Sequence, residues 1–448
     1  MQQEVDASRI PELTQIIEHV MAEAKRAGAS QCEADVGLQR GLGATVRLGE
    51  VDTVEYQRDR GLGVTVYFDK RKGSASTADL SAAAVRATVQ KACAIARFTA
   101  EDDCSGLADA ADLAREVPDL DLYHRWDLEP DQMVQLARDC EAAGMAMDPR
   151  LTNSEGASVS NQRGVRVYGN SHGFLAGFAS SSHSISCVLL AQQGEDMQRD
   201  FWYSKARDPA DLQDAAAIGQ RAAQNAVARL GARRLATQRA PVLFSPDMAR
   251  SLFSSFIGAI RGGSQYRKTS FLLDFAGQTV FPQFLQIEER PHIAKGLGSS
   301  PFDGEGVATR DRQLILDGVL QGYVLDSYSA RKLGLKTTGN SDGVHNLFIR
   351  STQVALTRAA LLRTMGTGLL VTELMGDGVN PVTGDYSHGA SGFWVENGEL
   401  AYPVHEITIA GNLRDMFKGI VALGDDVDNR NALHTGSVLI DALMIAGE

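Results

Sequence analysis

Residues 9–28 read RIPELTQIIEHVMAEAKRAG, and residues 130–147 read PDQMVQLARDCEAAGMAM. Both stretches repeat apolar side chains with the period of an amphipathic helix, and the first one ends at Gly28. Each is followed by short runs rich in β-forming residues, separated by turns, and then by an alanine-rich helical stretch. The same order occurs twice, so the sequence predicts two units of the form helix, antiparallel meander, helix.

The second helix of each unit has recognisable ends. In the first unit it is SAAAVRATVQKACAIAR (81–97), and Asp79 is its predicted N-cap. In the second unit it is ADLQDAAAIGQRAAQNAVARLG (210–231), with Asp208-Pro209 at its start. We expect the two units to face each other, with helices covering one face of each sheet.

The character of the sequence changes after about residue 235. Glycine becomes more frequent, and β-patterned runs alternate with turn dipeptides. Asp317-Gly318 and Asn397-Gly398 lie between apolar runs and predict tight hairpins. Three helices are expected in this half of the chain, over 246–261, 326–333 and 357–365.

These patterns predict an α+β protein with two domains. The N-terminal domain spans residues 1–234 and contains the repeat at about 1–100 and 128–232. The acidic, irregular segment 101–129 links the two repeated units. The C-terminal domain spans residues 235–448 and is rich in β-strands.

Composition excludes several classes of protein. Of the 448 residues, 44% are hydrophobic and 22% are charged, which is typical of a globular protein. The N-terminus MQQEVDASRI lacks the pattern of a secretory signal, and no apolar run approaches the ~20 residues of a membrane helix. A net charge of −12 argues against direct nucleic-acid binding. We expect a cytoplasmic protein without membrane contact, whose five cysteines are reduced thiols.

His405-Glu406 is the one His-Glu pair in the chain. Zinc hydrolases of the His-Glu-x-x-His type carry a second histidine one helical turn further along. Here the next residues are Ile, Thr, Ile, Ala and Gly (407–411), whose alternation predicts a strand. This pair therefore does not indicate a zinc-binding helix.

The expected helix 246–261 has the pattern of a buried amphipathic helix. It carries one carboxylate, Asp247, and no histidine. Its apolar face consists of Leu252, Phe253, Phe256, Ile257 and Ile260. No serine or cysteine in the chain has the setting of a nucleophile, so the sequence predicts neither a catalytic residue nor a metal ligand.

The segment 261–270, RGGSQYRKTS, follows this helix as an expected loop. Its glycines and basic residues can cradle an anion or contact a peptide, which makes it the candidate substrate-binding segment. The alternative is a helix terminus whose positive charge complements the helix dipole. The candidate residues are Arg261, Gly262, Gly263, Tyr266, Arg267 and Lys268.

A second cluster of polar residues lies near the C-terminus. These side chains could offer oxygen and nitrogen ligands to a metal, and they leave open an independent enzyme. Their spacing matches no known metal motif, and residues next to glycines are more simply turn formers. The members are Asp377, Asp385, His388, Glu396, His405 and Glu406.

Four stretches carry a resemblance to a known family. They are GVTVYFDKRKGSASTADLS (63–81), YRKTSFL (266–272), LDSYSARKLGLKTTGN (325–340) and the block 375–413, which begins MGDGVNPVTGDYSHGASG. The chain resembles the PmbA (TldE) branch of the TldD/PmbA family over nearly its full length. Members are bacterial and archaeal cytosolic proteins, once described as modulators of DNA gyrase and now regarded as subunits of a two-subunit metallopeptidase.

In the TldD branch of this family, a helix carries His-Glu-x-x-x-His and a C-terminal cysteine completes the zinc site. This chain has Pro246 to Ser251 at the corresponding helix, and His434-Thr435-Gly436-Ser437 near its C-terminus. The resemblance therefore implies the subunit that does not bind zinc. Zinc is expected in a TldD-like partner subunit.

The resemblance implies that this chain completes the partner's chamber, binds unfolded peptides, and is not catalytic alone. It also implies that the chain forms a homodimer when the partner is absent. The alternative function is a non-proteolytic binding protein that modulates gyrase or toxin–antitoxin components.

Overall fold

The computed structural model describes residues 4–447 of the chain. Helices and mainly antiparallel sheets occupy separate layers, so the protein belongs to the predicted α+β class. The elements up to residue 228 are η1 (Ala7–Arg9), α1 (Ile10–Arg26), β1 (Gln31–Arg47), β2 (Glu50–Phe68), β3 (Arg71–Thr77), α2 (Ala82–Phe98), α3 (Pro130–Met145), β4 (Leu151–Asn170), β5 (Leu175–Gln193), β6 (Asp196–Ala206), η2 (Pro209–Asp211) and α4 (Ala215–Ala228).

The two repeated units share one sheet of strand order β3-β2-β1-β4-β5-β6. Strands β1 and β4 pair antiparallel, from Glu33 opposite Asn170 to Val46 opposite Ala157. Pairing the first strand of each meander satisfies two backbone edges that would otherwise stay open. The expectation that the units face each other is therefore wrong, although each unit has the predicted order of elements.

The strands are longer than the short runs expected from the sequence. Strand β1 continues through Gly41 and Gly43 for 17 residues, and β4 extends over 20. The antiparallel register passes these glycines without a break, with Gly41 opposite Gln57 on β2. The paired strands on both sides hold the backbone extended where the local sequence suggested a turn.

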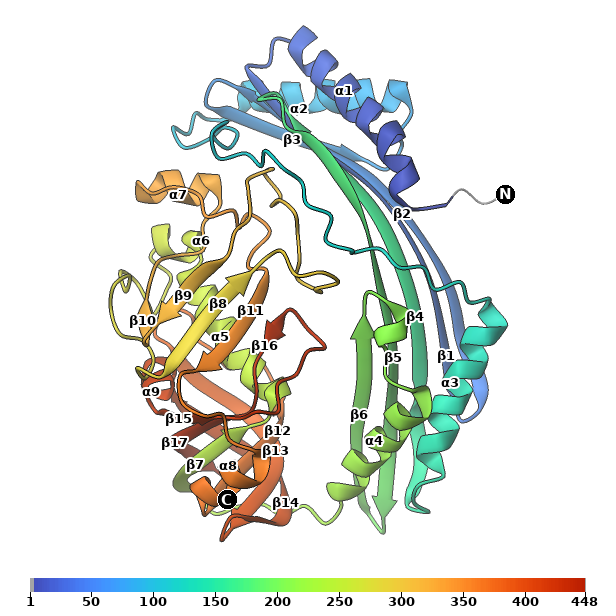
Figure 1. Cartoon of the computed structure of the whole chain (residues 1–448), viewed down its shortest axis with the longest axis vertical. Coiled ribbons are helices and arrows are strands. Elements are labelled where there is room, and N and C mark those ends of the chain that lie inside the picture. Colours follow the sequence, from blue (N-terminus) through green and yellow to red (C-terminus); the bar gives the residue numbers. More distant parts are fainter. Residues whose placement is uncertain (1–3, 448) are drawn as a thin grey trace.

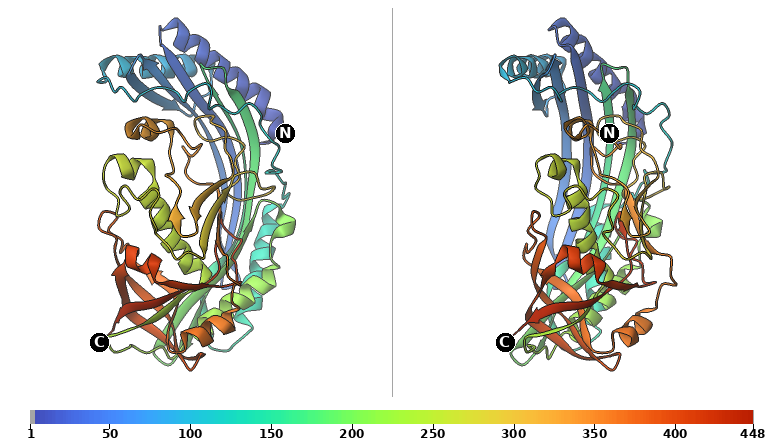
Figure 2. Two further views of the ribbon diagram at one scale, coloured as in Figure 1. Left: turned by 60° about the vertical axis from the view of Figure 1, so that its left-hand side comes forward. Right: turned by 90° about the vertical axis from the view of Figure 1, so that its left-hand side faces the viewer.

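Buried and more exposed side chains alternate along the strands, which gives this sheet one apolar and one polar face. At one end of β1, Ala34 and Val36 are buried in a core with α1 and α2. At the other end, Ala44 and Val46 are buried in a core with α3 and α4. Figures 1 and 2 show the sheet as a long arch, with α1 and α3 on its convex side and the C-terminal sheets inside its curve. The polar face therefore looks toward the C-terminal half.

The helix starts differ slightly from the sequence prediction. Ser81, and not Asp79, is the N-cap of α2, since its side chain accepts a hydrogen bond from the Ala84 N–H. Asp79 instead accepts from the N–H of Ser81 at 2.9 Å. Helix α4 begins with Asp214 as its N-cap, because Pro209 and its neighbours form the separate turn η2.

The second half of the chain contains two further sheets, with strand orders β10-β9-β8-β11-β16 and β14-β13-β12-β7-β17-β15. This part is rich in strands, as predicted. Its elements are β7 (Gln238–Phe244), α5 (Pro246–Ile260), α6 (Gly262–Tyr266), β8 (Leu285–Arg290), β9 (Arg312–Leu316), β10 (Val319–Leu320), α7 (Ser327–Leu333), β11 (Asn346–Ser351), α8 (Arg358–Met365), β12 (Gly368–Met375), β13 (Asp385–Glu396), β14 (Glu399–Asn412), α9 (Leu413–Lys418), β15 (Ile420–Leu423), β16 (Leu433–His434) and β17 (Val438–Ala446).

The predicted hairpins and helices of this half are present. Asp317 and Gly318 have φ values of 50° and 75°, and Asn397 and Gly398 have 52° and 78°. Positive φ at both central residues is the signature of the tight hairpin turn. Helices α5, α7 and α8 match the three expected helices, while α6 and α9 were not predicted. Within the described residues, no helix is long and apolar enough to cross a membrane.

Candidate functional site

A cavity of about 850 Å³ lies between the two halves of the molecule. Edge strand β6 and helix α4 form one side, and the start of α5 with the segment 426–434 forms the other. Trp202, Met248 and Phe393 contribute apolar walls. The charged lining residues are Asp200, Lys205, Arg207, Asp211, Arg221, Asp247, Lys295, Arg358, Asp426, Asp428 and Arg430.

Four of the charged side chains around this cavity form a closed network of ion pairs. Arg430 Nη2 lies 2.8 Å from Asp247 Oδ2, and Arg430 Nε lies 2.9 Å from Asp428 Oδ1. Arg250 also donates hydrogen bonds to both Asp247 and Asp428. Two carboxylates and two guanidinium groups thus neutralise one another. We call these four residues the α5 network.

The α5 network also holds the two halves of the molecule together. The guanidinium of Arg430 lies 3.9 Å from the ring centroid of Trp202 and 4.2 Å from that of Tyr203, both on β6. Its Nη1 donates to the backbone carbonyl of Tyr203 at 3.2 Å. Because Asn225 donates to the carbonyl of Phe201, two outward carbonyls of this edge strand are occupied by side chains.

The charges of the α5 network shift the pKa of its members. Burial alone would raise the pKa of Asp428, but the hydrogen bonds and charge of Arg430, with the charge of Arg250, lower it to about 2. Burial would lower the pKa of Arg430, yet its bonds to Asp428 and the charges of both aspartates raise it. Both groups are therefore charged at neutral pH.

Helix α5 is the element at which the resemblance places zinc ligands in the TldD branch. Its predicted apolar face is buried as expected. Both carboxylates at its N-terminal end are bound by guanidinium groups, whose positive charge repels a cation. Among the described residues, no group of three or more His, Cys, Asp or Glu could hold a metal ion. This set of donors does not fit a zinc site.

His434, near the place of the TldD cysteine, is also engaged by neighbouring side chains. Its ring stacks on Phe348 with a centroid distance of 4.5 Å, and its Nδ1 lies 3.1 Å from Asn429 Oδ1. Burial lowers its pKa, so the neutral ring is favoured. This histidine lines the cavity, and the part of the chain that the structure describes has no group of three or more His, Cys, Asp or Glu around it that could hold a metal ion.

The predicted substrate-binding residues surround a separate pocket of about 580 Å³. Five of them line it, namely Arg261, Gly262, Gly263, Tyr266 and Arg267, whereas Lys268 does not. The segment is not a plain loop, because residues 262–266 form the short helix α6. Helix α5 ends at Ile260, and Val324 forms backbone hydrogen bonds with Ile260 and Gly262 at this point. The chain then forms the helical turn of α6.

The structure gives several of these residues a packing role. A Cβ atom at Gly262 would lie 2.1 Å from Ser329 Oγ, so close contact with α7 requires glycine there. Arg267 lies over the ring of Tyr266, with its guanidinium 5.2 Å from the ring centroid. Arg261, Arg267 and Lys268 are exposed, so the three basic residues of the segment are accessible to a ligand.

The polar residues of segment 377–406 do not converge on one point. Glu406 pairs with Arg234, and Asp385 accepts hydrogen bonds from Thr383 and Asn412. The ring of His388 packs on Tyr386 at 4.6 Å, and Asp377 is exposed. His405 and Glu406 lie on β14, in agreement with the predicted strand.

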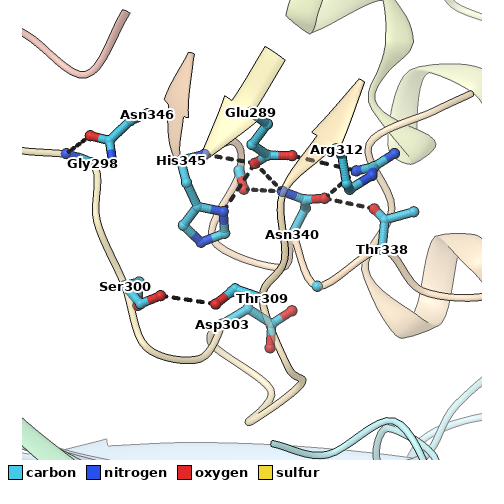
Figure 3. Close-up of polar contacts among 12 residues, drawn as sticks. Glu289, Gly298, Ser300, Asp303, Thr309, Arg312, Thr338, Asn340, His345 and Asn346 are labelled. Atoms are coloured by element: carbon cyan, nitrogen blue, oxygen red, sulfur yellow. Dashed lines mark hydrogen bonds and ion pairs between the residues drawn. The ribbon is translucent and has the colours of Figure 1, made fainter. Parts of the chain in front are cut away.

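A buried polar cluster around Glu289 is the second charged centre of the C-terminal half (Figure 3). Glu289 is 1% exposed and accepts hydrogen bonds from the backbone N–H and Nδ1 of His345 and from Asn340. Arg312 lies 3.6 Å from its second oxygen. Burial would raise the pKa of Glu289, but the bonds from His345 lower it. These contacts fix the segment 338–345 against β8, which is a structural role.

Comparisons with known proteins give the same family at three places along the chain. Residues 32–96 match PmbA/TldA metallopeptidase domain 1, residues 123–230 match the central domain, and residues 237–447 match the C-terminal domain.

Full-length relatives and solved structures agree. The chain is 49% identical to metalloprotease PmbA of Escherichia coli O157:H7, over 96% of this chain and 94% of that protein. It is 47% identical to a PmbA homologue of Haemophilus influenzae, over 97% and 96%. A Bacteroides thetaiotaomicron protein described as a proposed modulator of DNA gyrase has the same fold, with a TM-score of 0.92 and 26% identity over 98% and 99% of the two chains. TldE from Thermococcus kodakarensis shares the fold, with a TM-score of 0.85 and 22% identity over 96% and 100%.

The fold and these matches define a protein of the TldD/TldE type, in which a long arched sheet encloses a β-rich C-terminal half. The chain belongs to the PmbA/TldD metallopeptidase family.

Proposed function

We propose that this chain is the subunit without catalytic zinc in a two-subunit metallopeptidase. It pairs with a TldD-like zinc subunit, completes that subunit's chamber, and binds unfolded peptide substrates. The observation that carries this proposal is the α5 network. At the start of α5, the helix that corresponds by its order along the chain to the zinc-binding helix of the TldD branch, Asp247 and the neighbouring Asp428 are neutralised by Arg250 and Arg430.

The polar face of the arched sheet supports a role in holding peptide. A hollow of about 870 Å³ lies along it, lined by Asp35, Gln39, Arg60 and Arg166 together with glycines of several strands. A wide polar surface suits an unfolded peptide, because its polar side chains can form hydrogen bonds with the peptide backbone and do not require a particular side chain on the peptide.

The pocket next to α6 supports peptide contact at a second place. Arg267 and Lys268 are exposed cations that can contact a carbonyl or carboxylate oxygen of a peptide. We propose Arg261, Gly262, Gly263, Tyr266, Arg267 and Lys268 as the substrate-binding segment, with Gly262 and Gly263 acting through packing.

A degradation assay on an unstructured peptide tests this function. The chain alone should leave the peptide intact, while a mixture with a TldD-like subunit should cleave it faster than that subunit alone. Replacing Arg267 and Lys268 by Ala should reduce cleavage by the mixture about fivefold, through lost charged hydrogen bonds. The matched control replaces Arg86 and Lys91, two exposed cations of α2 far from the pocket in sequence.

The outcomes separate the parts of the proposal. Cleavage by the isolated chain at the rate of the mixture, abolished by a chelator, would show a catalytic metal in this subunit and contradict the assignment. Normal cleavage by the Arg267/Lys268 variant would remove only the role of that segment. Thermal melts of each variant verify that the chain remains folded.

A further inference from the structure

Three cations that line the large cavity have side chains without a hydrogen bond or an ion pair within 4 Å, among the described residues: Lys205 on β6, Arg221 on α4, and Arg358, the first residue of α8. Arg430, by contrast, is paired with Asp247 and Asp428, and Arg250 behind it is paired with the same two carboxylates. Of the three unpaired cations, Arg221 and Arg358 carry guanidinium groups. Arg221 has its guanidinium 5.3 Å from the ring centroid of Trp202, which orients it without neutralising its charge.

Arg221 and Arg358 both have exposed side chains that a ligand can reach. The protein around Arg358 lowers its pKa below the ordinary value, and the positive charge of Arg221 lowers it further. Asp426 is the carboxylate that opposes this effect, but both of its oxygens already accept hydrogen bonds from Ser437, at 2.7 and 2.6 Å. The two guanidinium groups therefore repel each other, and an anion that contacts both would relieve this repulsion.

The charge balance of the cavity points to an anionic ligand. Apart from the neutral α5 network, the lining has more cations (Lys205, Arg207, Arg221, Lys295 and Arg358) than carboxylates (Asp200, Asp211 and Asp426), so its net charge is positive. A carboxylate reduces this excess charge, and the planar guanidinium group is the cation best suited to bind a carboxylate through paired hydrogen bonds. The apolar walls formed by Phe201, Trp202 and Phe393 suit the side chains next to it.

We propose that Arg221 and Arg358 form a binding site for a carboxylate group of a peptide substrate. The carboxylate is either the C-terminus of the peptide or an Asp or Glu side chain. This inference rests on the proposed function, because it assigns to the peptide-binding subunit the group that positions its substrate. Because the two carboxylates and two guanidinium groups of the α5 network neutralise one another, the network adds no net charge to this site.

Fluorescence anisotropy with three labelled peptides tests the site on the purified full-length chain. The first peptide is unstructured, lacks Asp and Glu, and has a free C-terminal carboxylate. The second is its C-terminal amide, and the third is that amide with one internal Glu. The free acid should bind about tenfold more tightly than the plain amide, because the amide has no charge to pair with the guanidinium groups.

Variants then test whether the preference for the free carboxylate depends on Arg221 and Arg358. Arg221→Gln with Arg358→Gln should abolish the preference for the carboxylate, and Arg363→Gln should keep it, since Arg363 is an exposed arginine of the same helix α8 outside the cavity. If the internal Glu restores tight binding to the amide, side chains are a source of the carboxylate. If it does not, the site takes the C-terminus.

Equal binding of all three peptides by the unmodified chain would overturn the carboxylate site, and so would a preference that survives in the double variant. Either result leaves the proposed function standing, because the cleavage assay of the mixture measures completion of the chamber separately. Absence of binding by every peptide would contradict both proposals.

Discussion

Asp428 is the more buried of the two carboxylates of the α5 network, and like Asp247 it accepts hydrogen bonds from both arginines. Replacing Asp428 by Asn leaves two guanidinium groups facing the single carboxylate of Asp247. Removal of one partner from a largely buried ion pair typically costs about 3–5 kcal/mol, and the partial exposure of this site reduces that to about 2–4 kcal/mol. Urea denaturation at pH 7 measures the loss of stability.

The same substitution has a defined pH dependence. The folded-state pKa of Asp428, about 2, lies below the ordinary value of 3.8, so its contribution to stability is present above that value. This contribution is lost as the pH falls toward 2, and the difference between variant and parent should narrow there. Asp377→Asn, at an exposed turn, should change stability by less than about 0.5 kcal/mol and serves as control. A difference that is constant between pH 7 and pH 3 would contradict this account.

The pKa of Glu305 is shifted in the opposite direction to that of Asp428. Burial, with the charges of Asp303 and Asp326, raises its pKa to about 7, although Ser327 donates a hydrogen bond to it. Its ionisation therefore opposes folding, and stability should fall as the pH rises from about 4.5 to about 7. Glu305→Gln keeps the acceptor for Ser327 and should raise stability at pH 8 by about 1–3 kcal/mol, with little effect at pH 4.5. Thermal melts across this range test it, and a gain that is equal at both pH values would refute it.

At the residue scale, the sequence predicts the features that follow from local patterns, namely the spacing of apolar residues and the turn dipeptides. The buried face of α5 follows from helical spacing alone, and so do the positive φ values of the two hairpin turns. The pairing of Asp247 with Arg430 and of Arg250 with Asp428 could not be found this way, because Asp428 and Arg430 lie about 180 residues further along the chain. An ion pair between distant segments leaves no local pattern.

The packing of α3 against α4 is the element-scale feature most sensitive to substitution. A Cβ atom at Gly219 of α4 would lie 1.8 Å from the carbonyl oxygen of Cys140 on α3. Gly219→Ala must push the helices apart, and we expect a loss of about 2–4 kcal/mol from overpacking. The free energy of unfolding in urea measures this loss.

Gly258 provides the control for that substitution. It lies within α5, and a Cβ atom there meets nothing within 4 Å. Gly258→Ala should raise stability by about 0.5–1 kcal/mol, through the better helix propensity of alanine. If both substitutions have the same sign, close helix contact does not explain the glycine in α4.

The elements themselves were largely predictable, whereas their assembly was not. Helical and β-patterned stretches identified the repeated units and most helices of the C-terminal half. The pairing of β1 with β4 depends on two strands about 120 residues apart, and local sequence contains no preference for edge-to-edge over face-to-face assembly. Helix α6 was missed because two glycines suggested a loop, while contact with α7 holds them in a helical turn.

For the whole molecule, the free edge of β2 bears on the expected pairing of subunits. Residues 62–68 of β2 pair with β3, but residues 50–61 pair only with β1. Val51, Val54 and Tyr56 are exposed along this stretch. An open strand edge with apolar side chains favours association with another chain. We predict that the isolated chain forms a homodimer that uses this edge.

Sedimentation velocity at micromolar concentration tests this prediction. The parent chain should sediment as a dimer, and Val54→Lys with Tyr56→Lys should shift it to monomer, because two buried charges are not tolerated in such an interface. The control replaces Leu335, an exposed leucine after α7, by Lys and should not change the mass. A monomeric parent chain would contradict the predicted self-association, and a dimeric double variant would show that the interface lies elsewhere.

The most direct test of the assignment to the zinc-free subunit is the zinc content of the purified chain. The chain is dialysed against micromolar zinc, freed of loosely bound ions and analysed for metal per protein. Because the α5 network places two guanidinium groups around both carboxylates at the start of α5, we predict far less than one zinc ion per chain. One tightly held zinc ion per chain would contradict the central claim.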